Sequence, residues 1–326
     1  MNAALSLMAD TPGDFAHGPG RSCPLAYRYN PSVFARPPEW HADTLYVVGG
    51  LYGNPFALDA IEALFARESG SKHMVFNGDF HWFDIDPALF ASIDARVHQH
   101  TALRGNVETE LANADSGAGC GCAYPSHVAD ADVARSNTIL QRLRETAHQC
   151  PAQRVALGVL PMHSVAQVGA ARIAVVHGDA ESLAGWQFDP SALDQPANRA
   201  WLDRIFDQAQ VDVFASSHTC TPGLRQWKGA NHSIRAVINN GSAGMGHAAG
   251  HTHGTITRIS LHDAPSGVAV LNETRLLGVY IQAIQVDFDD ARWQQQFLAQ
   301  WPPGSAAHMS YWSRITGSMA NCTAAV

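Results

Sequence analysis

Short runs of apolar residues recur along the chain, and most of them end at glycine or at a polar residue. The first run is TLYVVGG at 44–50, and in the NPFALDAIEALFARES that follows it the apolar side chains recur at helical spacing. Asn54 can cap this helix, and Pro55 suits its first turn, where a missing N–H has no intrahelical partner to lose. The pattern predicts a buried strand followed directly by a helix.

The same kind of pattern predicts further strands and helices in alternation. Apolar strands are expected at HMVFNGD (73–79), RIAVVHGD (172–179), VDVFASSH (211–218) and IRAVINNGS (234–242), with shorter ones, GTITRIS and GVYIQAIQVDF, within 255–288. Helical spacing is found near 130–148, 190–209 and 289–301. Because strands alternate with helices, we expect an α/β fold.

The chain divides into a lead-in and one domain. Residues 1–43 are rich in proline and glycine, which predicts an irregular segment, and residues 44–326 read as a single domain. A net charge of -8 argues against a nucleic-acid surface, and no apolar run approaches the roughly 20 residues of a membrane helix. No signal peptide is evident, and six irregularly spaced cysteines suit a reducing compartment. We therefore expect a cytoplasmic protein; its oligomeric state is left open.

Polar side chains gather where the predicted strands end. The segments are Asn77-Gly78-Asp79, Arg104-Gly105-Asn106, His177-Gly178-Asp179, Ser217-His218-Thr219-Cys220 and Asn239-Asn240-Gly241-Ser242. Any one of them can simply satisfy a turn. Together they offer a carboxylate, an amide and two imidazoles at the sheet edge where α/β proteins bind ligands. Such donors suit Fe, Mn or Zn.

In this order, these segments resemble the motifs of the calcineurin-like metallophosphoesterase superfamily, from about residue 45 to about residue 261. The family's Asp-x-His-Gly-Asn opening corresponds to Gly50-Leu51-Tyr52-Gly53-Asn54, and its Gly-Asn-His-Glu/Asp motif to Gly105-Asn106-Val107-Glu108. The resemblance implies a four-layer αββα sandwich with two adjacent metals that activate water against phosphoesters. It also implies an insertion near 109–150 and a C-terminal extension from about 262.

The departures from the family pattern fall on one metal position. The resemblance assigns one metal to Asp79, Asn106, His177 and His218, which are all present. At the other position the ligands are replaced by Gly50, Tyr52 and Cys220, and only the shared Asp79 remains. We therefore expect a divergent branch with one firmly held transition metal. A second ion, bound by a Tyr52 phenolate and a Cys220 thiolate, stays open as an alternative.

Two further clusters of metal-binding residue types lie outside these motifs. The GHTHG segment at 250–254 follows the Asn-x-Gly-Ser turn, whereas the family's paired histidines precede it, so we expect a loop feature. The alternative is that His247, His251 or His253 serve as surrogate ligands. Cys120 and Cys122 form a Cys-x-Cys loop, which either binds metal, senses redox state or holds two ordinary thiols.

The altered opening suggests how phosphate is held without the second cation. The turn from Gly50 through Tyr52 to Asn54 leads into a helix N-terminus, where free N–H groups favour an anion. We expect these residues to bind substrate, and Arg104 to act beside Asp79 in catalysis. The alternative is a tight strand–helix turn alone. Val107 stands where many relatives carry a histidine that protonates the leaving group.

Two functions of different class follow. The first is a metal-dependent phosphoesterase that hydrolyses a phosphomonoester or phosphodiester with a metal-activated water. Its partner would be a small phosphorylated substrate or a phosphoprotein. The second is a binding or scaffold protein that keeps the fold without catalysis. We favour the enzyme, because a scaffold has no need of a buried Asp79 and His177 together.

Overall fold

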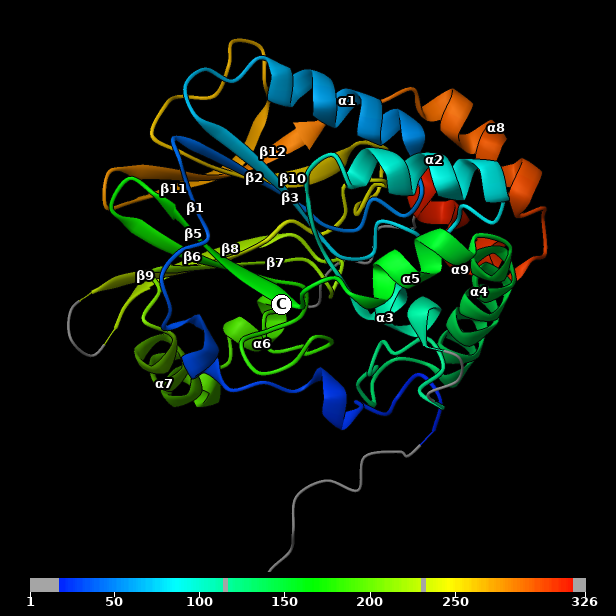
Figure 1. Cartoon of the computed structure of the whole chain (residues 1–326), viewed down its shortest axis with the longest axis horizontal. Helices are drawn as coiled ribbons and strands as arrows, with labels where there is room; N and C mark the ends of the chain where they lie inside the picture. The colour runs from blue at the N-terminus through cyan, green and yellow to red at the C-terminus, as the bar shows by residue number, and fades with distance from the viewer. Residues whose placement is uncertain (1–17, 114–116, 230–232, 319–326) are drawn as a thin grey trace, which may run out of the picture.

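Two mixed sheets pack face to face at the centre of the molecule, and helices cover the outer face of each (Figure 1). The structure is a computed structural model that describes residues 18–113, 117–229 and 233–318. The predicted four-layer αββα arrangement is confirmed.

The first sheet has the strand order β11-β12-β10-β2-β3-β4. Its strands are β2 (Thr44–Val48), β3 (Lys72–Asn77), β4 (Thr101–Leu103), β10 (Gly254–Ser260), β11 (Val270–Leu276) and β12 (Val279–Val286). The strands β2, β3 and β4 are parallel, and β10, β12 and β11 extend the sheet in antiparallel fashion.

The second sheet has the order β1-β5-β6-β7-β9-β8. Its strands are β1 (Trp40–Ala42), β5 (His163–Val168), β6 (Ala171–Val176), β7 (Val213–Ser216), β8 (Gly223–Lys228) and β9 (Ile234–Asn239). Strands β6, β7 and β9 are parallel to one another. The segment expected to be an irregular lead-in therefore supplies β1, which pairs with β5 at the sheet edge.

Helices occupy the outer layers and one end of the sandwich. They are α1 (Pro55–Ala66), α2 (Pro87–Val97), α3 (Asn106–Ala112), α4 (Asp130–Gln149), α5 (Pro151–Gly158), α6 (Pro190–Leu193), α7 (Arg199–Ala209), α8 (Asp290–Gln300) and α9 (Ala306–Ile315), with short 3-10 helices η1 (Leu25–Tyr27), η2 (Pro31–Phe34) and η3 (Pro196–Asn198). The single helix expected over 190–209 is wrong: Pro196 begins a separate 3-10 turn, so α6 and α7 are distinct. Within the described residues, no helix is long and apolar enough to cross a membrane.

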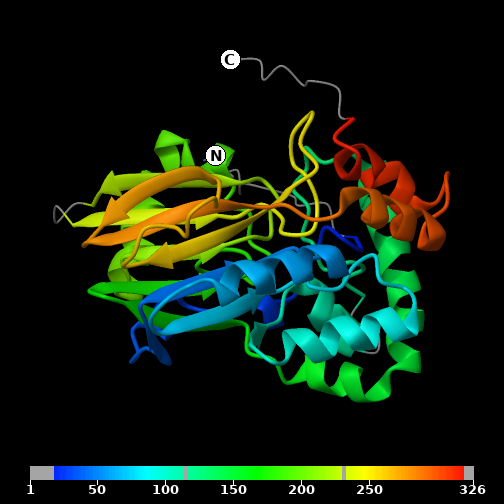
Figure 2. The same cartoon turned by 90° about the horizontal axis from the view of Figure 1, so that it is seen from above.

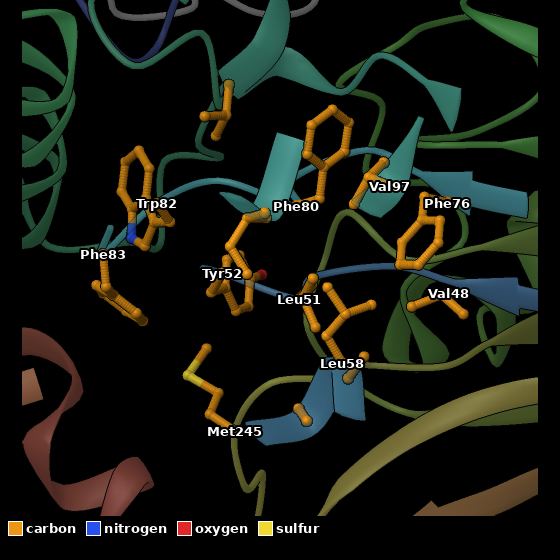
Figure 3. Packing of buried hydrophobic residues seen from close by; sticks show 14 of the residues in the cluster. Val48, Leu51, Tyr52, Leu58, Phe76, Phe80, Trp82, Phe83, Val97 and Met245 are labelled. Atoms are coloured by element: carbon orange, nitrogen blue, oxygen red, sulfur yellow. The ribbon is translucent and has the colours of Figure 1, made fainter. Parts of the chain in front are cut away.

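The continuous apolar run of β2 is explained by its burial on both faces. Leu45 and Val47 point between the two sheets, whereas Tyr46 and Val48 point into the cluster under the helices. Successive side chains of a strand alternate between faces, so a strand covered on both sides carries no polar alternation. Figure 3 shows Val48 in this outer cluster, with Trp82 at the far end of it.

The helices α3, α4, α5 and α9 gather at one end of the sandwich, on the side where β3 ends (Figures 1 and 2). Helix α4 belongs to the segment expected to be an insertion, and α9 to the C-terminal extension. The two helices pack against each other. Segments that lie far apart in sequence thus meet beside the strand ends.

The first sheet contains a charged side chain that is fully buried. Arg258 of β10 is 0% exposed, and its guanidinium makes bonds of 2.7 and 2.9 Å to the two carboxylate oxygens of Glu68. It also donates to Gln282 and to main-chain carbonyls, and Tyr46 donates to Glu68. Every charge in this network therefore has hydrogen-bonded partners, as burial requires.

Removing one partner should leave the other charge buried and unpaired. We expect Arg258→Met to lower the free energy of unfolding by about 3–5 kcal/mol. The double variant Arg258→Met with Glu68→Met should lose less than the single variant, because no charge is left behind. Urea unfolding measures both. A loss below about 1 kcal/mol in the single variant would show that the pair has no structural importance.

Candidate metal centre and substrate cavity

The carboxyl ends of the parallel strands bring the four predicted metal ligands together. Asp79 follows β3, Asn106 begins α3 just after β4, His177 follows β6, and His218 follows β7. All four side chains are buried. Asp79, His177 and His218 form a group whose ligand atoms all lie within 4.8 Å of one another.

The distances centre on one nitrogen of His177. Its Nε2 lies 3.0 Å from Asn106 Oδ1 and 3.4 Å from Asp79 Oδ1. The same atom lies 3.1 Å from His218 Nδ1. Adjacent ligands at right angles about one transition metal, with bonds of about 2.1 Å, stand roughly 3 Å apart. The spacing of these oxygen and nitrogen donors therefore fits a single metal ion.

The tautomers of the two histidines point to the same conclusion. His177 Nδ1 lies 2.8 Å from the carbonyl oxygen of Asn77, and His218 Nε2 lies 3.0 Å from that of Cys122. A carbonyl only accepts, so these nitrogens donate, and in the two neutral rings the facing pair, Nε2 and Nδ1, would both present lone pairs. Two lone pairs at this separation repel each other unless a proton or a metal ion lies between them.

The proton that competes with a metal belongs to His177. Burial disfavours its cation, but the neighbouring Asp79 outweighs burial and raises the pKa of His177. Burial, together with the charge of His177, lowers the pKa of His218 to about 3. Burial disfavours the anion of Asp79, but the neighbouring His177 outweighs it and holds the pKa of Asp79 below its usual value. The cluster thus presents the carboxylate of Asp79 and the neutral imidazole of His218 at neutral pH, whereas a metal must displace the proton of His177 in order to bind.

A buried carboxylate fixes the loop that carries Asp79. Glu108 accepts hydrogen bonds from the main-chain N–H groups of Asp79 at 2.9 Å, Phe80 at 3.0 Å and Gly105 at 2.8 Å. The loops after β3 and β4 also approach very closely: a Cβ added at Gly78 would lie 2.5 Å from the Gly105 backbone. Only glycine allows this approach, which places Asp79 beside Asn106.

The Cys-x-Cys loop orients two of the ligands through its carbonyls. The Asn106 amide donates to the Cys120 oxygen at 2.9 Å, which turns its own oxygen toward His177. The Cys122 oxygen accepts from His218 and also from Trp186. The described cysteines are all free thiols. The loop thus supports the metal ligands through its main chain, a role that the sequence did not indicate.

A hydrogen-bonded pair of side chains fills the other metal position. Tyr52 Oη lies 2.6 Å from Cys220 Sγ, and a Cβ added at Gly50 would lie 3.0 Å from the Tyr52 ring. Burial raises the pKa of both Tyr52 and Cys220, so the phenol and the thiol keep their protons. Because metals bind the deprotonated forms, this pair does not favour a second ion.

The structure gives no support to the expectation that Gly50 and Asn54 bind phosphate. The N–H groups of residues 50, 52, 53 and 54 already donate, at 2.8–3.2 Å, to the main-chain carbonyls of Gly78, Asp79, Phe80 and Leu51. The Asn54 side chain caps α1 by accepting from the N–H groups of residues 56 and 57. Of the three predicted substrate-binding residues, only Tyr52 lines the cavity beside the metal ligands.

Arg104 also lies elsewhere, which corrects its predicted role. Its guanidinium reaches the carbonyl of Gly158 at 3.3 Å and does not line the cavity. The cavity is lined instead by Arg314 of α9, whose Nε donates to Gly246 at 3.1 Å and whose Nη2 lies 3.4 Å from Ser242 Oγ. Sequence reasoning missed Arg314 because it follows no strand and belongs to no motif.

The cavity has a volume of about 150 Å³, with Asp79, Asn106 and His218 among the residues that line it. Half of the other lining residues are aromatic, namely Tyr52, Trp82, Tyr124, Trp186 and Tyr311. These side chains come from four separate loops and from α9. Only the position of Tyr52 was suggested by the sequence, because the others lie outside the recurring strand-end motifs.

The histidines of GHTHG lie in the loop before β10. The rings of His247, His251 and His253 have centroids 5.1–6.3 Å apart. None of the three lines the cavity or belongs to the group formed by Asp79, His177 and His218. The structure therefore gives no support to their use as surrogate ligands.

Comparison with known proteins is informative only at the level of structure. No protein-family model and no curated protein matches the sequence. A hypothetical protein of Pyrococcus horikoshii OT3 is similar in structure with a TM-score of 0.54 at 18% identity, over 82% of this chain and 97% of that one. A metallophosphoesterase from Sphaerobacter thermophilus is similar with a TM-score of 0.52 at 14% identity, over 85% and 100%. The chain therefore has the metallophosphoesterase fold, and the resemblance drawn from its motifs is confirmed at that level.

The ligand geometry predicts which histidines hold the metal. We expect His218→Ala to abolish tight binding of Mn, Fe or Zn, because it removes one of two facing imidazole nitrogens. The matched variants His251→Ala and His253→Ala should keep about one equivalent per chain. Elemental analysis after exhaustive dialysis measures this. Loss of the metal in His253→Ala, with retention in His218→Ala, would reverse the assignment.

The Tyr52–Cys220 pair predicts how a second metal could be admitted. Gly50→Asp alone should not recruit one, because the new side chain would collide with the Tyr52 ring. The triple variant Gly50→Asp, Tyr52→His, Cys220→His removes that collision and supplies ionisable ligands. We expect its metal content to rise from about one to about two equivalents. An unchanged content would show that the position lacks the shape for an ion.

Proposed function

We propose that the chain is a metal-dependent phosphoric ester hydrolase that works with one firmly held transition metal. The observation that carries the proposal is the facing pair of ring nitrogens, His177 Nε2 and His218 Nδ1, 3.1 Å apart and flanked by Asp79 and Asn106. The metallophosphoesterase fold supports it, since the cluster occupies the edge at which the strand ends converge.

Different residues of the chain have different roles in the proposed reaction. Asp79, Asn106, His177 and His218 would hold the ion, which when bound supplies an acidified water and polarises a phosphoryl oxygen. Arg314 contributes a fixed positive charge on the other side of the cavity, since its guanidinium is held by main-chain and hydroxyl oxygens. It can pair with a phosphate oxygen where relatives would use a second cation.

The non-catalytic alternative is less favoured. Burying a carboxylate beside two imidazoles costs stability unless the charge is compensated. In a scaffold nothing would compensate this loss of stability, whereas in a metal site the bound cation would compensate the charge of the buried carboxylate. The substrate side also has the character of a pocket, since the cavity beside the ligands has a volume of about 150 Å³. That size suits a small phosphorylated molecule or a single phosphorylated side chain of a protein.

Hydrolysis of nitrophenyl mono- and diesters tests the proposal directly. Purified protein is assayed with added Mn, Fe or Zn beside Asp79→Ala, with circular dichroism to confirm that the variant is folded. We expect metal-dependent turnover in the wild type and at least a hundredfold loss in the variant. Equal rates in the two proteins with every metal and ester would favour the scaffold.

Arg314 and Arg104 provide a matched pair of substitutions. A charge-assisted contact to a phosphate oxygen contributes about 1.5–3 kcal/mol, so Arg314→Ala should lower kcat/KM roughly tenfold to a hundredfold. Arg104→Ala removes the same charge outside the cavity and should leave kcat/KM nearly unchanged. Arg314→Lys should recover part of the loss. A larger effect from Arg104→Ala would overturn the assignment of Arg314.

A further inference from the structure

The wall of the cavity next to the metal ligands is aromatic. The Trp186 ring meets that of His218 edge to face, with centroids 5.3 Å apart, and Tyr124 lies 5.8 Å beyond Trp186. Tyr311 closes the wall from α9 and is fixed by an edge-to-face contact with Phe83 at 5.1 Å. The group bound to phosphorus would therefore lie against aromatic rings.

The polar atoms of three of the aromatic residues in the wall are occupied by the protein. Trp186 Nε1 donates to the Cys122 carbonyl at 3.0 Å, and Tyr124 Oη bonds to Ser136 Oγ at 2.9 Å. Tyr52 Oη is paired with Cys220. These three side chains therefore offer ring carbon to a ligand, which recognises an apolar or aromatic group. Trp82 Nε1 is a buried donor that has no partner among the described residues.

Among the described residues that line the cavity, Asp79 carries the sole carboxyl group and His218 the sole imidazole. Both are assigned as metal ligands, so neither is free to protonate a leaving group, and phenols and thiols are weak acids. Val107 occupies part of the wall.

A leaving group that receives no proton must be stable as an anion. An alkoxide is a strong base and leaves poorly without protonation, whereas a phenol such as tyrosine has a pKa of about 10 and its anion leaves readily. The aromatic lining of the cavity and the lack of a free acid among its described lining residues therefore both favour an ester whose leaving group is a phenol.

Resting on the proposed hydrolase function, we propose that the substrate is an aryl phosphate, an ester in which phosphorus is bonded through oxygen to an aromatic ring. The ring lies against Trp186, Tyr124 and Tyr311, and the phosphate lies between the metal ligands and Arg314. The metal ligands and Arg314 line the same cavity of about 150 Å³, so the phosphate shares this volume with the ring and the aromatic part is small.

The reaction is balanced without any further reactant. A water oxygen forms a new bond to phosphorus, and the bond from phosphorus to the aryl oxygen breaks. Its electron pair leaves on the aryl oxide, which takes a proton from solvent, while the proton lost by the water passes to solvent. The products are phosphate, or a phosphomonoester from a diester, and a phenol.

Binding of a non-hydrolysable pair tests the aromatic wall apart from catalysis. Phenylphosphonate and methylphosphonate differ only in the group bound to phosphorus, and calorimetry with the zinc-loaded protein measures both. We expect phenylphosphonate to bind about tenfold more tightly or better. Tyr311→Ala should weaken phenylphosphonate about threefold to tenfold and leave methylphosphonate unchanged. Trp312→Ala, on the same helix but outside the cavity, controls for damage to α9 and should change neither.

Turnover of matched esters tests the leaving group. Phenyl phosphate, a tyrosine-phosphorylated peptide, benzyl phosphate and ethyl phosphate are compared in the wild type. Aryl esters, free or peptide-borne, should exceed the two alkyl esters by at least a hundredfold in kcat/KM, and substituted phenyl phosphates should react faster as the phenol becomes more acidic. The free and peptide forms show which source of the aryl phosphate fits the cavity.

The outcomes separate the two proposals. Equal binding of the two phosphonates, or benzyl phosphate turned over as fast as phenyl phosphate, would overturn the aryl assignment while leaving the hydrolase in place. If no ester is hydrolysed with any metal, the hydrolase proposal and the aryl substrate fall together. Tight phenylphosphonate binding in that case would reveal only an aromatic anion site.

Discussion

The contact between His177 Nε2 and His218 Nδ1 is the constraint on which the rest of the site depends. The opposite nitrogen of each ring is fixed by a main-chain carbonyl, so neither ring can turn its N–H toward the other. The carbonyl that holds His218 belongs to the Cys120–Cys122 loop, and another in the same loop holds Asn106. The loop between α3 and α4 is therefore part of the metal centre.

The two halves of the site differ in the chemistry of their side chains. The half built on Asp79, Asn106 and His177 keeps donors that are costly to bury. In the other half, Tyr52 and Cys220 replace ionisable ligands by a neutral hydrogen-bonded pair. Tyr52, Asp79 and Cys220 share a left-handed backbone, with φ of 56, 53 and 57°. Such strained positions persist only where the surrounding structure holds them, so the packing around these three loops fixes their backbone.

From the sequence, strands with a regular apolar pattern and site residues at strand ends could be predicted, and few other features. Strands β2, β3, β6, β7, β9, β10 and β12 were expected because continuous apolar runs mark strands buried on both faces. The exposed β11 and the partly polar β8 carry no such signal. Asp79 and His177 were suggested by strand ends. Arg314 was not, because a helix that covers a cavity shows only ordinary amphipathic spacing. The expectation for Gly50 and Asn54 came from counting N–H groups without their partners, which lie in the next loop.

The docking of α9 beside α4 has a consequence for how the protein matures. Every metal ligand precedes α9 in the chain, so during synthesis the residues that bind the ion emerge well before Tyr311 and Arg314. A chain that has loaded its metal would then still have an open, water-filled site. On the proposed function, selectivity would be completed only when the last helix packs against the body of the protein, so the metal site and the substrate wall would form at different times.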